Sequence, residues 1–234
     1  VKARKLESMK ALVTGASGFV GSTLCEELIR RGIETQALMR KTSSLANLGA
    51  AQISPVEGDL RNPESLERAV MNADVIFHVA GVVAARSKED FFVANATGTR
   101  NLLAAVKRSG RKIHRFVYVS SLAAAGPSTA ERPGCEGDEC KPVSDYGASK
   151  LGGEQAVLEY KNDFPVCIVR PPAVYGPRDK GVMTFFQAVN IGVLPLLGLA
   201  NPDPRRYSFV HVDDLVRLII LAGMAPEMKS GEIF

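Results

Sequence analysis

The 234-residue sequence predicts an α/β domain built on a doubly wound parallel sheet, and three observations carry this prediction. Short apolar runs alternate with segments of helical periodicity from residue 10 to residue 171. Runs such as "DVIFHVAG" at 74–81 are apolar at nearly every position, which is typical of strands buried on both faces. The first run is followed at once by a glycine-rich turn and a helix. Such a sheet is covered by helices on both sides.

The first half of the predicted domain contains four strands. Strands are expected at 10–14, 33–39, within 51–59, and at 74–81. The first helix, at 19–32, has Val20, Leu24 and Leu28 on one face and stops at Gly32. A second, short helix is expected over 62–72, where "NPES" provides a capped start.

The second half continues the alternation and then loosens. Helices are expected over much of 89–109 and at 145–160, strands at 115–121 and 165–171. After residue 171 glycine and proline become frequent, and only 207–212 and 213–224 are typical of a strand and a helix. We therefore divide the chain into a main domain at 9–171, a smaller and incomplete region at 172–234, and a leader segment at 1–8. The final "SGEIF" predicts the start of a further strand.

Composition excludes several classes of protein. The formal charge of +4 is small and the cations are scattered, so no nucleic-acid surface is predicted. No apolar run is long enough to cross a bilayer and no signal peptide is visible, so we expect a cytoplasmic location. The four cysteines lack the dense spacing of a disulfide scaffold. Cys135 and Cys140 are interpreted as two solvent-side thiols, and no metal site is predicted.

The segment "TGASGFVG" places Gly15, Gly18 and Gly21 between the first strand and the first helix. The spacing suits a tight turn, close approach of the backbone to a pyrophosphate, and close helix packing, with the helix N-terminus directed at the anion. We therefore predict that the main domain binds a dinucleotide. The turn residues assigned to the cofactor are Gly15, Ser17, Gly18, Phe19, Val20 and Gly21.

The end of the second strand decides which dinucleotide is expected. An Asp or Glu that binds the adenosine ribose is usual there, but the sequence has Met39 followed by Arg40 and Lys41. A guanidinium at this position pairs with a 2'-phosphate, so NADP is preferred and NAD remains possible. The alternative is that Arg40 and Lys41 are a solvated loop pair. Asp59, followed by Leu60, is a second candidate cofactor contact, through the adenine amino group, or a cap of the next helix.

A candidate catalytic set follows the fifth strand. "DYGASK" places Tyr146 and Lys150 four residues apart, on one face of a helix. Ser121 ends the strand "RFVYVSS", where sites in open parallel sheets lie. Lys150 is expected to lower the pKa of Tyr146 and to bind the nicotinamide ribose. Tyr146 would then exchange a proton with a carbinol oxygen while Ser121 holds that oxygen.

Taken in order, "TGASGFVG", "GDL", "HVAG", "NATGTRNLL", "VSS", "YGASK", "RPPAVYGPRD" and "FVHVDDL" resemble the extended short-chain dehydrogenase/reductase family, the NAD-dependent epimerase/dehydratases, from residue 9 to residue 234. The resemblance implies a Rossmann fold and a catalytic set of Ser121, Tyr146 and Lys150. It also implies that Ala80 and Gly81 lie near the cofactor ribose and that Pro171 to Val174 lie beside the nicotinamide. Asn95 either helps to order the site or is a helix-packing amide.

Within this family three functions are weighed for the chain. A nucleotide-sugar epimerase leads because of the family resemblance, an NADPH-dependent reductase of a ketone or steroid-like substrate is the alternative, and a non-catalytic NADP-binding sensor comes third. Dehydration is disfavoured because Leu122 to Ala125 replace the family's Thr-Asp-Glu set. Tyr207 stands where epimerases often carry an Arg for the substrate diphosphate, with Arg205 and Arg206 just before it. Relatives also imply a homodimer through the helices within 89–109 and at 145–160.

Overall fold

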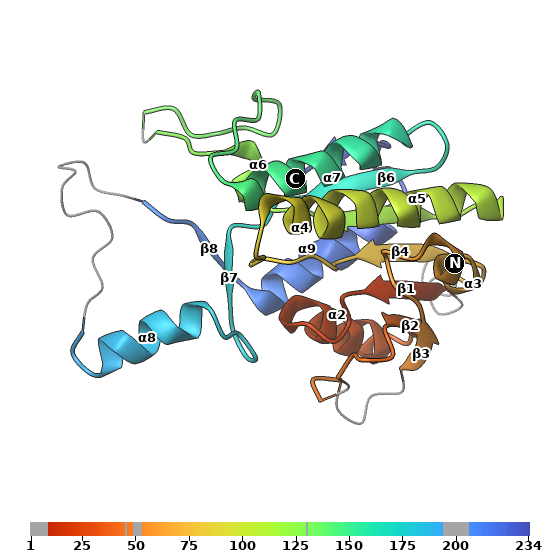
Figure 1. Ribbon diagram of the computed structural model, residues 1–234, viewed down its shortest axis with the longest axis horizontal. Helices are drawn as coiled ribbons and strands as arrows, with labels where there is room; N and C mark the ends of the chain where they lie inside the picture. Colours follow the sequence, from red (N-terminus) through yellow and green to blue (C-terminus); the bar gives the residue numbers. More distant parts are fainter. Residues whose placement is uncertain (1–8, 45, 49–52, 130, 194–205) are drawn as a thin grey trace.

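The computed structural model describes residues 9–44, 46–48, 53–129, 131–193 and 206–234. A seven-stranded sheet forms its centre, in the order β3-β2-β1-β4-β5-β6-β9, and every neighbouring pair is parallel (Figure 1). The strands are β1 Lys10–Thr14, β2 Glu34–Met39, β3 Ser54–Glu57, β4 Val75–His78, β5 Arg115–Val119, β6 Val166–Val169 and β9 Glu232–Ile233. The predicted doubly wound parallel sheet is confirmed.

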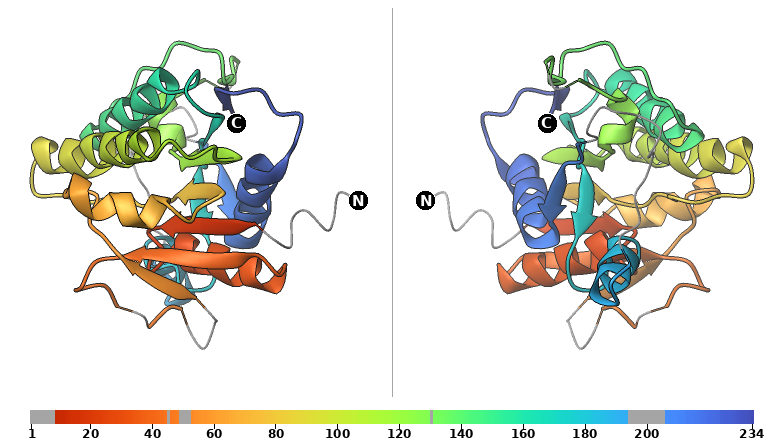
Figure 2. Two further views of the ribbon diagram at one scale, coloured as in Figure 1. Left: turned by 90° about the vertical axis from the view of Figure 1, so that its right-hand side faces the viewer. Right: turned by 90° about the vertical axis from the view of Figure 1, so that its left-hand side faces the viewer.

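Helices cover both faces of this sheet, which Figure 2 shows nearly edge-on. One face carries α2 Phe19–Arg30 and α9 Val212–Met224; the other carries α3 Pro63–Val70, α5 Gly98–Ser109 and α7 Asp145–Glu159. Along β5 the side chains alternate between the two cores: Val117 and Val119 pack on the first face, Phe116 and Tyr118 on the second. Burial on both faces explains why these strands are apolar at successive positions.

The segment predicted as one helix within 89–109 is interrupted. It consists of α4 Lys88–Phe92, a π-helical turn η1 Val93–Thr97, and α5. Asn95 in the π-helical turn is fully buried. π-helical turns inside helices are frequent at functional sites, and apolar periodicity does not reveal them.

Elements after residue 171 fall into two groups. β7 Ala173–Tyr175 pairs in parallel with β8 Phe209–His211, and α8 Val182–Asn190 projects away from the main sheet (Figure 1). α9 instead packs on the main sheet, and β9 extends it beyond β6. The strand expected at 207–212 and the strand start in "SGEIF" correspond to β8 and β9. The sequence did not predict α6 Leu122–Ala125, β7 or α8.

Several expectations are not decided by this architecture. The leader at 1–8 and Arg205 lie outside the described residues. The division of the chain at residue 171 and the homodimer stay predictions, although α5 and α7 do lie side by side. Within the described ranges, no helix has the length and apolar character needed to span a membrane.

Candidate active site

The turn between β1 and α2 is built so that only glycine fits. Gly15 has a positive φ of 71°, and a Cβ added to it would lie 2.7 Å from the backbone nitrogen of Ala80. A Cβ on Gly21 would lie 2.1 Å from the carbonyl oxygen of Gly15. Gly18 is the N-cap of α2 and has no side chain to cover the first N–H groups of the helix. This turn therefore offers backbone donors to an anion, as a pyrophosphate site requires.

The end of β4 connects this turn to the catalytic side. Ala80 touches Gly15, and a Cβ on the next residue, Gly81, would lie 3.5 Å from Nζ of Lys150 and 3.1 Å from Oδ1 of Asn95. The glycine turn, the segment 80–81 and Lys150 thus form one continuous surface.

Helix α7 brings Tyr146 and Lys150 to this surface. The Ser144 hydroxyl caps the helix by accepting from the Gly147 N–H at 3.1 Å. A Cβ on Gly147 would lie 2.3 Å from the carbonyl oxygen of Ala123, so the helix packs closely against α6. The predicted spacing of Tyr146 and Lys150 on one helical face follows from their positions in α7.

The three predicted catalytic residues meet at the carboxyl end of β5. The hydroxyls of Ser121 and Tyr146 are hydrogen-bonded to each other, and the Ser121 hydroxyl also accepts from the Ala123 N–H at 3.2 Å. Nζ of Lys150 donates to the carbonyl oxygen of Val119 at 2.8 Å. It also lies 4.2 Å from the centre of the Tyr118 ring, a cation–π contact. Ser121 and Tyr146 are thus paired, and Lys150 is held at the end of the same strand.

The electrostatics differ from the sequence-based expectation. Burial raises the pKa of Tyr146 above its ordinary value, and the hydrogen bond with Ser121 only partly opposes it. The net shift of this pKa in the protein alone is therefore upward, opposite to the lowering that was expected from Lys150. Burial also lowers the pKa of Lys150 to about 7, against the nearby Glu154 carboxylate, which raises it. Desolvation outweighs the hydrogen bond with Ser121 at Tyr146 and the neighbouring carboxylate of Glu154 at Lys150.

Asn95 holds the segment after β4 in place, and so fills both roles that the sequence left open. Its Oδ1 accepts from the Val82 N–H at 2.8 Å, and its Nδ2 donates to the Val82 carbonyl oxygen at 3.0 Å and to Oγ of Ser149 at 2.9 Å. These bonds tie the segment 80–82 to α7. The amide both packs a helix and orders the site.

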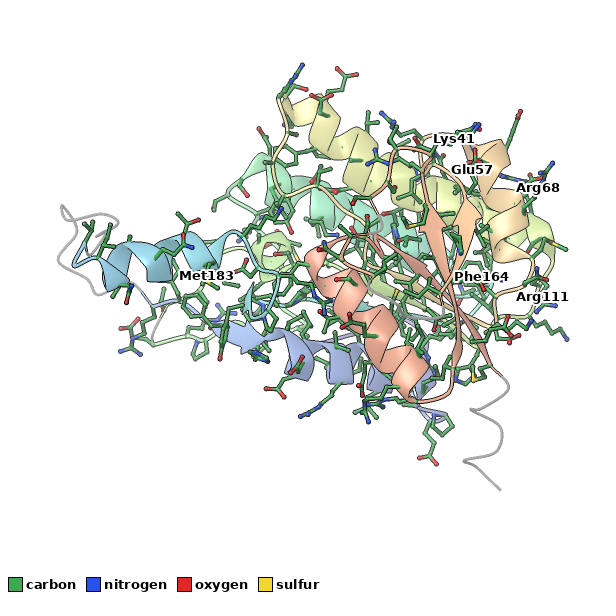
Figure 3. The ribbon with its side chains drawn as sticks, turned by 90° about the horizontal axis from the view of Figure 1, so that it is seen from below. Lys41, Glu57, Arg68, Arg111, Phe164 and Met183 are labelled. Atoms are coloured by element: carbon green, nitrogen blue, oxygen red, sulfur yellow. The ribbon has the colours of Figure 1, made fainter. Side chains whose placement is uncertain are left out.

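A polar pocket lies at the carboxyl ends of β2 and β3, where Arg40 and Lys41 are. It is lined by Arg40, Lys41, Thr42, Glu57, Gly58, Asp59, Arg61, Asn62 and Ser65. Lys41 and Glu57, labelled in Figure 3, form an ion pair at 3.4 Å. Of the two acids in this pocket, the sequence predicted Asp59 but not Glu57. Glu57 is aligned with Met39 across the β2–β3 pair, so the neighbouring strand places its carboxylate in the pocket.

Asp59 pairs with a cation within this pocket. Its carboxylate accepts from the Arg61 backbone N–H at 2.9 Å and from the Arg61 guanidinium at 2.9 and 3.3 Å. These bonds hold the pKa of Asp59 below its ordinary value. The alternative that Asp59 caps the next helix is wrong, because Asn62 is the N-cap of α3. The Leu60 carbonyl accepts from Asn101 in α5, and its role towards a cofactor stays a prediction.

The sequence missed a buried ion pair beside the catalytic set. The Arg170 guanidinium donates to both carboxylate oxygens of Glu154, at 2.6 and 2.9 Å, and the Ser120 hydroxyl donates to one of them at 2.5 Å. Glu154 is one helical turn beyond Lys150, and Ser120 precedes Ser121. In the sequence, this ion pair is indicated only by the position of Glu154, a carboxylate four residues after Lys150 on the same helix.

The remaining predicted residues have structural partners. The Pro171 carbonyl accepts from the Leu122 N–H at 2.9 Å, and Val174 in β7 packs against the core that contains α9. Ser17 is linked through its carbonyl to Asn47, while Phe19 and Val20 pack against the same core. Cys135 is exposed and Cys140 half-buried, and neither is in a disulfide. In the described part of the chain, no three His, Cys, Asp or Glu residues cluster as a metal site would require.

Comparison with known proteins places these features in context. A sequence model of the NAD dependent epimerase/dehydratase family matches residues 11–234. A ceramide reductase of Caulobacter vibrioides is 35% identical over 222 residues, 94% of this chain and 63% of that protein. A 4-hydroxy-2-methyl-3-oxo-4-farnesyl-3,4-dihydroquinoline-1-oxide ketoreductase of Stigmatella aurantiaca is 34% identical, covering 97% of this chain and 67% of that protein. The chain thus spans about two thirds of the length of these two relatives.

Solved structures of similar fold contain nucleotide cofactors. A dTDP-glucose 4,6-dehydratase from Streptomyces venezuelae with NAD bound has a TM-score of 0.83 and 28% identity, covering 97% of this chain and 74% of that one. A UDP-glucose 4-epimerase of Thermus thermophilus in complex with NAD has a TM-score of 0.81 and 28% identity, covering 97% and 76%.

Proposed function

Because this chain belongs to the NAD dependent epimerase/dehydratase family, of the extended short-chain dehydrogenase/reductase type, we propose that it is an NADPH-dependent reductase of a lipophilic ketone. The observation that carries the chemistry is the hydrogen bond between Ser121 and Tyr146 with Lys150 beside Gly81. The choice of a reductase rests on the two curated relatives at 34–35% identity, which are named as a reductase and a ketoreductase. The epimerase favoured by the sequence alone becomes the second candidate.

The residues of the site suit proton donation to a ketone. When bound, reduced nicotinamide supplies a hydride to the carbonyl carbon. Tyr146 donates the proton to the carbonyl oxygen, since a phenol with its ordinary pKa of about 10 is already protonated at neutral pH. The Ser121 hydroxyl holds the same oxygen by a hydrogen bond. Lys150, whose Nζ lies beside Gly81, binds the ribose hydroxyls.

A dinucleotide fits the residues that would hold it. At Gly15 and Gly21 there is no room for a Cβ atom. A pyrophosphate can approach the backbone closely only where side chains are absent in this way. The family binds NAD or NADP, and three cations in the pocket support the phosphorylated form: Arg40, Lys41 and Arg61. Glu57 pairs with Lys41 and Asp59 pairs with Arg61, so two of the three positive charges are offset. The test below therefore compares NADH with NADPH.

The substrate side supports a lipophilic ligand. Leu122 follows Ser121 directly and is exposed, and the elements beyond β6 expose further large apolar side chains, namely Tyr175, Met183, Tyr207 and Phe209. Met183 lies on α8, away from the main sheet (Figure 3). The names of two relatives, a ceramide reductase and a farnesyl-quinoline ketoreductase, describe substrates with long apolar groups.

Epimerisation of a nucleotide sugar is supported by a different observation. Structural neighbours include a UDP-glucose 4-epimerase and a dTDP-glucose 4,6-dehydratase with NAD. Arg206 precedes Tyr207 and is exposed, as a contact for a diphosphate would be. An epimerase keeps its cofactor bound and shows no net reduction, which separates it from a reductase.

The test measures oxidation of NADPH and of NADH with a panel of long-chain ketones and, separately, interconversion of UDP- and dTDP-sugars. We expect ketone-dependent oxidation of NADPH, and about a thousandfold loss of turnover in Tyr146→Phe with cofactor binding retained. Sugar interconversion without net oxidation would support the epimerase instead. If the chain binds the cofactor but converts no ketone or sugar, and Tyr146→Phe does not change that binding, the non-catalytic sensor would be supported.

A further inference from the structure

A series of buried hydrogen bonds connects β1, β4 and α5. It does not include the hydroxyls of Ser121 and Tyr146. His78 in β4 has no exposed surface. Its Nδ1 lies 2.6 Å from Oγ1 of Thr14, and its Nε2 lies 2.9 Å from Oγ1 of Thr99. The Ala80 N–H donates to Oγ1 of Thr14 at 3.2 Å, and the Thr99 hydroxyl donates to the Asn95 carbonyl oxygen at 2.7 Å.

These contacts indicate which group donates and which accepts in each hydrogen bond of the series. Thr99 has one hydroxyl proton and gives it to Asn95, so its oxygen must accept from Nε2–H of His78. Nδ1 of a neutral imidazole is then an acceptor, and the Thr14 hydroxyl donates to it. The remaining lone pair of Thr14 accepts from Ala80. With the ring proton on Nε2, each of these donors and acceptors has a partner, and the Tyr118 hydroxyl, 3.5 Å from the Asn95 carbonyl oxygen, adds a donor at the same end of the series.

Both ends of the series act on the same short segment. Ala80 is bound through Thr14, and Val82 is bound through the side-chain amide of Asn95, at 2.8 and 3.0 Å. Gly81 lies between them, with the space beside its Cα occupied by Asn95 and Lys150. One connected set of buried groups therefore clamps the segment 80–82 on both sides of the residue that faces the ammonium of Lys150.

We propose that His78 is a positioning residue: as a neutral imidazole with its proton on Nε2, it completes the clamp that holds the segment 80–82 against Lys150 and so sets dinucleotide affinity. The link to dinucleotide affinity rests on the proposed function; the clamp itself does not. Burial supports the neutral form, since it lowers the pKa of His78 to about 3 and the charge of Lys150 acts in the same direction. The titratable groups facing the ring are Lys150 and the hydroxyl of Tyr118.

The first test reads the tautomer directly. Nitrogen chemical shifts of His78 in the wild-type chain should show a proton on Nε2 and none on Nδ1 at pH 7, and the ring should stay neutral at pH 5. A proton on Nδ1, or a charged ring at pH 7, would reverse the order of donors and acceptors and overturn the proposal.

The second test uses a matched pair of variants at Thr99. Thr99→Val keeps the shape and removes the hydroxyl, whereas Thr99→Ser keeps the hydroxyl and removes a methyl group. We expect amide hydrogen exchange at Ala80 and Val82 to become about tenfold faster in Thr99→Val and to stay within about twofold in Thr99→Ser. Amides of β5 serve as the reference for global opening. Equal effects of the two variants would show that packing, and not the hydroxyl, holds the segment.

The third measurement is the affinity for NADPH and for NADH. Thr99→Val should weaken binding of the preferred dinucleotide about tenfold, and Thr99→Ser by less than about twofold. An unchanged affinity in Thr99→Val would overturn the role in binding. If the wild-type chain bound neither dinucleotide, the proposed function would fail, and the tautomer and exchange results would still decide whether the clamp exists.

Discussion

Charged side chains occur in two regions along the carboxyl edge of the sheet, and the two regions differ in burial. In the first region, Lys150 of the proposed catalytic set and its neighbours Glu154 and Arg170 are 3%, 1% and 9% exposed, and each has a hydrogen-bonding partner. In the polar pocket, the Lys41 and Glu57 side chains are 78% and 65% exposed and meet at 3.4 Å. The first region has a fixed, closed arrangement, whereas the second has a loose surface pair.

The difference in burial sets what each charge contributes. Water and salt screen the exposed pair, and such pairs typically contribute about 0–1 kcal/mol. A buried charge has lost its hydration, so removing its partner leaves it uncompensated. Changes at the catalytic end should therefore alter folding, whereas changes at the pocket should alter only what binds there.

The largest effect is expected for Glu154→Gln. This change leaves the Arg170 guanidinium buried without its carboxylate, so we expect the free energy of unfolding to fall by about 3–5 kcal/mol. Urea denaturation measures it. The matched control is Glu57→Gln, which removes the same charge from the exposed pair and should cost less than about 1 kcal/mol. Similar losses in both variants would remove the distinction between the two regions.

The next effect concerns the pH dependence contributed by Lys150. Its pKa is about 7 in the folded chain and near 10.5 when unfolded, so between these values the unfolded chain binds one more proton at this site. Stability from this site therefore rises as the pH rises from 7 to about 10, and below pH 7 the buried ammonium lowers it. Lys150→Met should be most stabilising relative to the wild type below pH 7.

Denaturation of the wild type and Lys150→Met at intervals from pH 6 to pH 10 tests this prediction. The stability advantage of the variant should shrink across this range by an amount on the order of 4 kcal/mol, since the range spans most of the gap between the two pKa values. Lys41→Met is the exposed counterpart, with an expected change of less than about 1 kcal/mol. A difference between Lys150→Met and wild type that stayed constant with pH would mean that burial does not perturb Lys150.

Local sequence patterns predicted the parts of the site that depend on neighbouring residues. The glycine spacing predicted the turn because Gly18 and Gly21 both meet the backbone of Gly15 within the same turn. The spacing of Tyr146 and Lys150 predicted a shared helical face, and α7 provides it. Short-range geometry of this kind is set by helix and turn parameters, so a sequence alone can specify it.

The parts that were missed depend on strand pairing and on long-range contacts. Glu57 enters the pocket only because β3 pairs with β2 in a register that sets it beside Met39. Arg170 reaches Glu154 because β6 lies beside α7, and the sequence gives no periodicity for that pairing. The raised pKa of Tyr146 likewise depends on how deeply the phenol is buried, which no motif encodes.

The smallest effect on folding, and the sharpest test of the exposed region, is expected for Arg40→Ala. The guanidinium is solvent-exposed in the pocket, so its removal should leave the free energy of unfolding within about 0.5 kcal/mol of the wild-type value. Affinity for NADPH should fall about tenfold, because a charge-assisted contact to the 2'-phosphate is lost, while affinity for NADH stays the same. Calorimetric titration with both dinucleotides measures the ratio.

Glu57→Gln should act in the opposite direction on the same ratio. Removing a carboxylate from the pocket frees Lys41 and reduces repulsion of a phosphate, so NADPH affinity should rise a few-fold with NADH affinity unchanged. A wild-type preference for NADH, unaltered by either variant, would mean that the pocket cations are a solvated surface pair. If the two variants move the ratio in opposite directions without a change in stability, cofactor choice in this chain is set by exposed charges that the fold does not need.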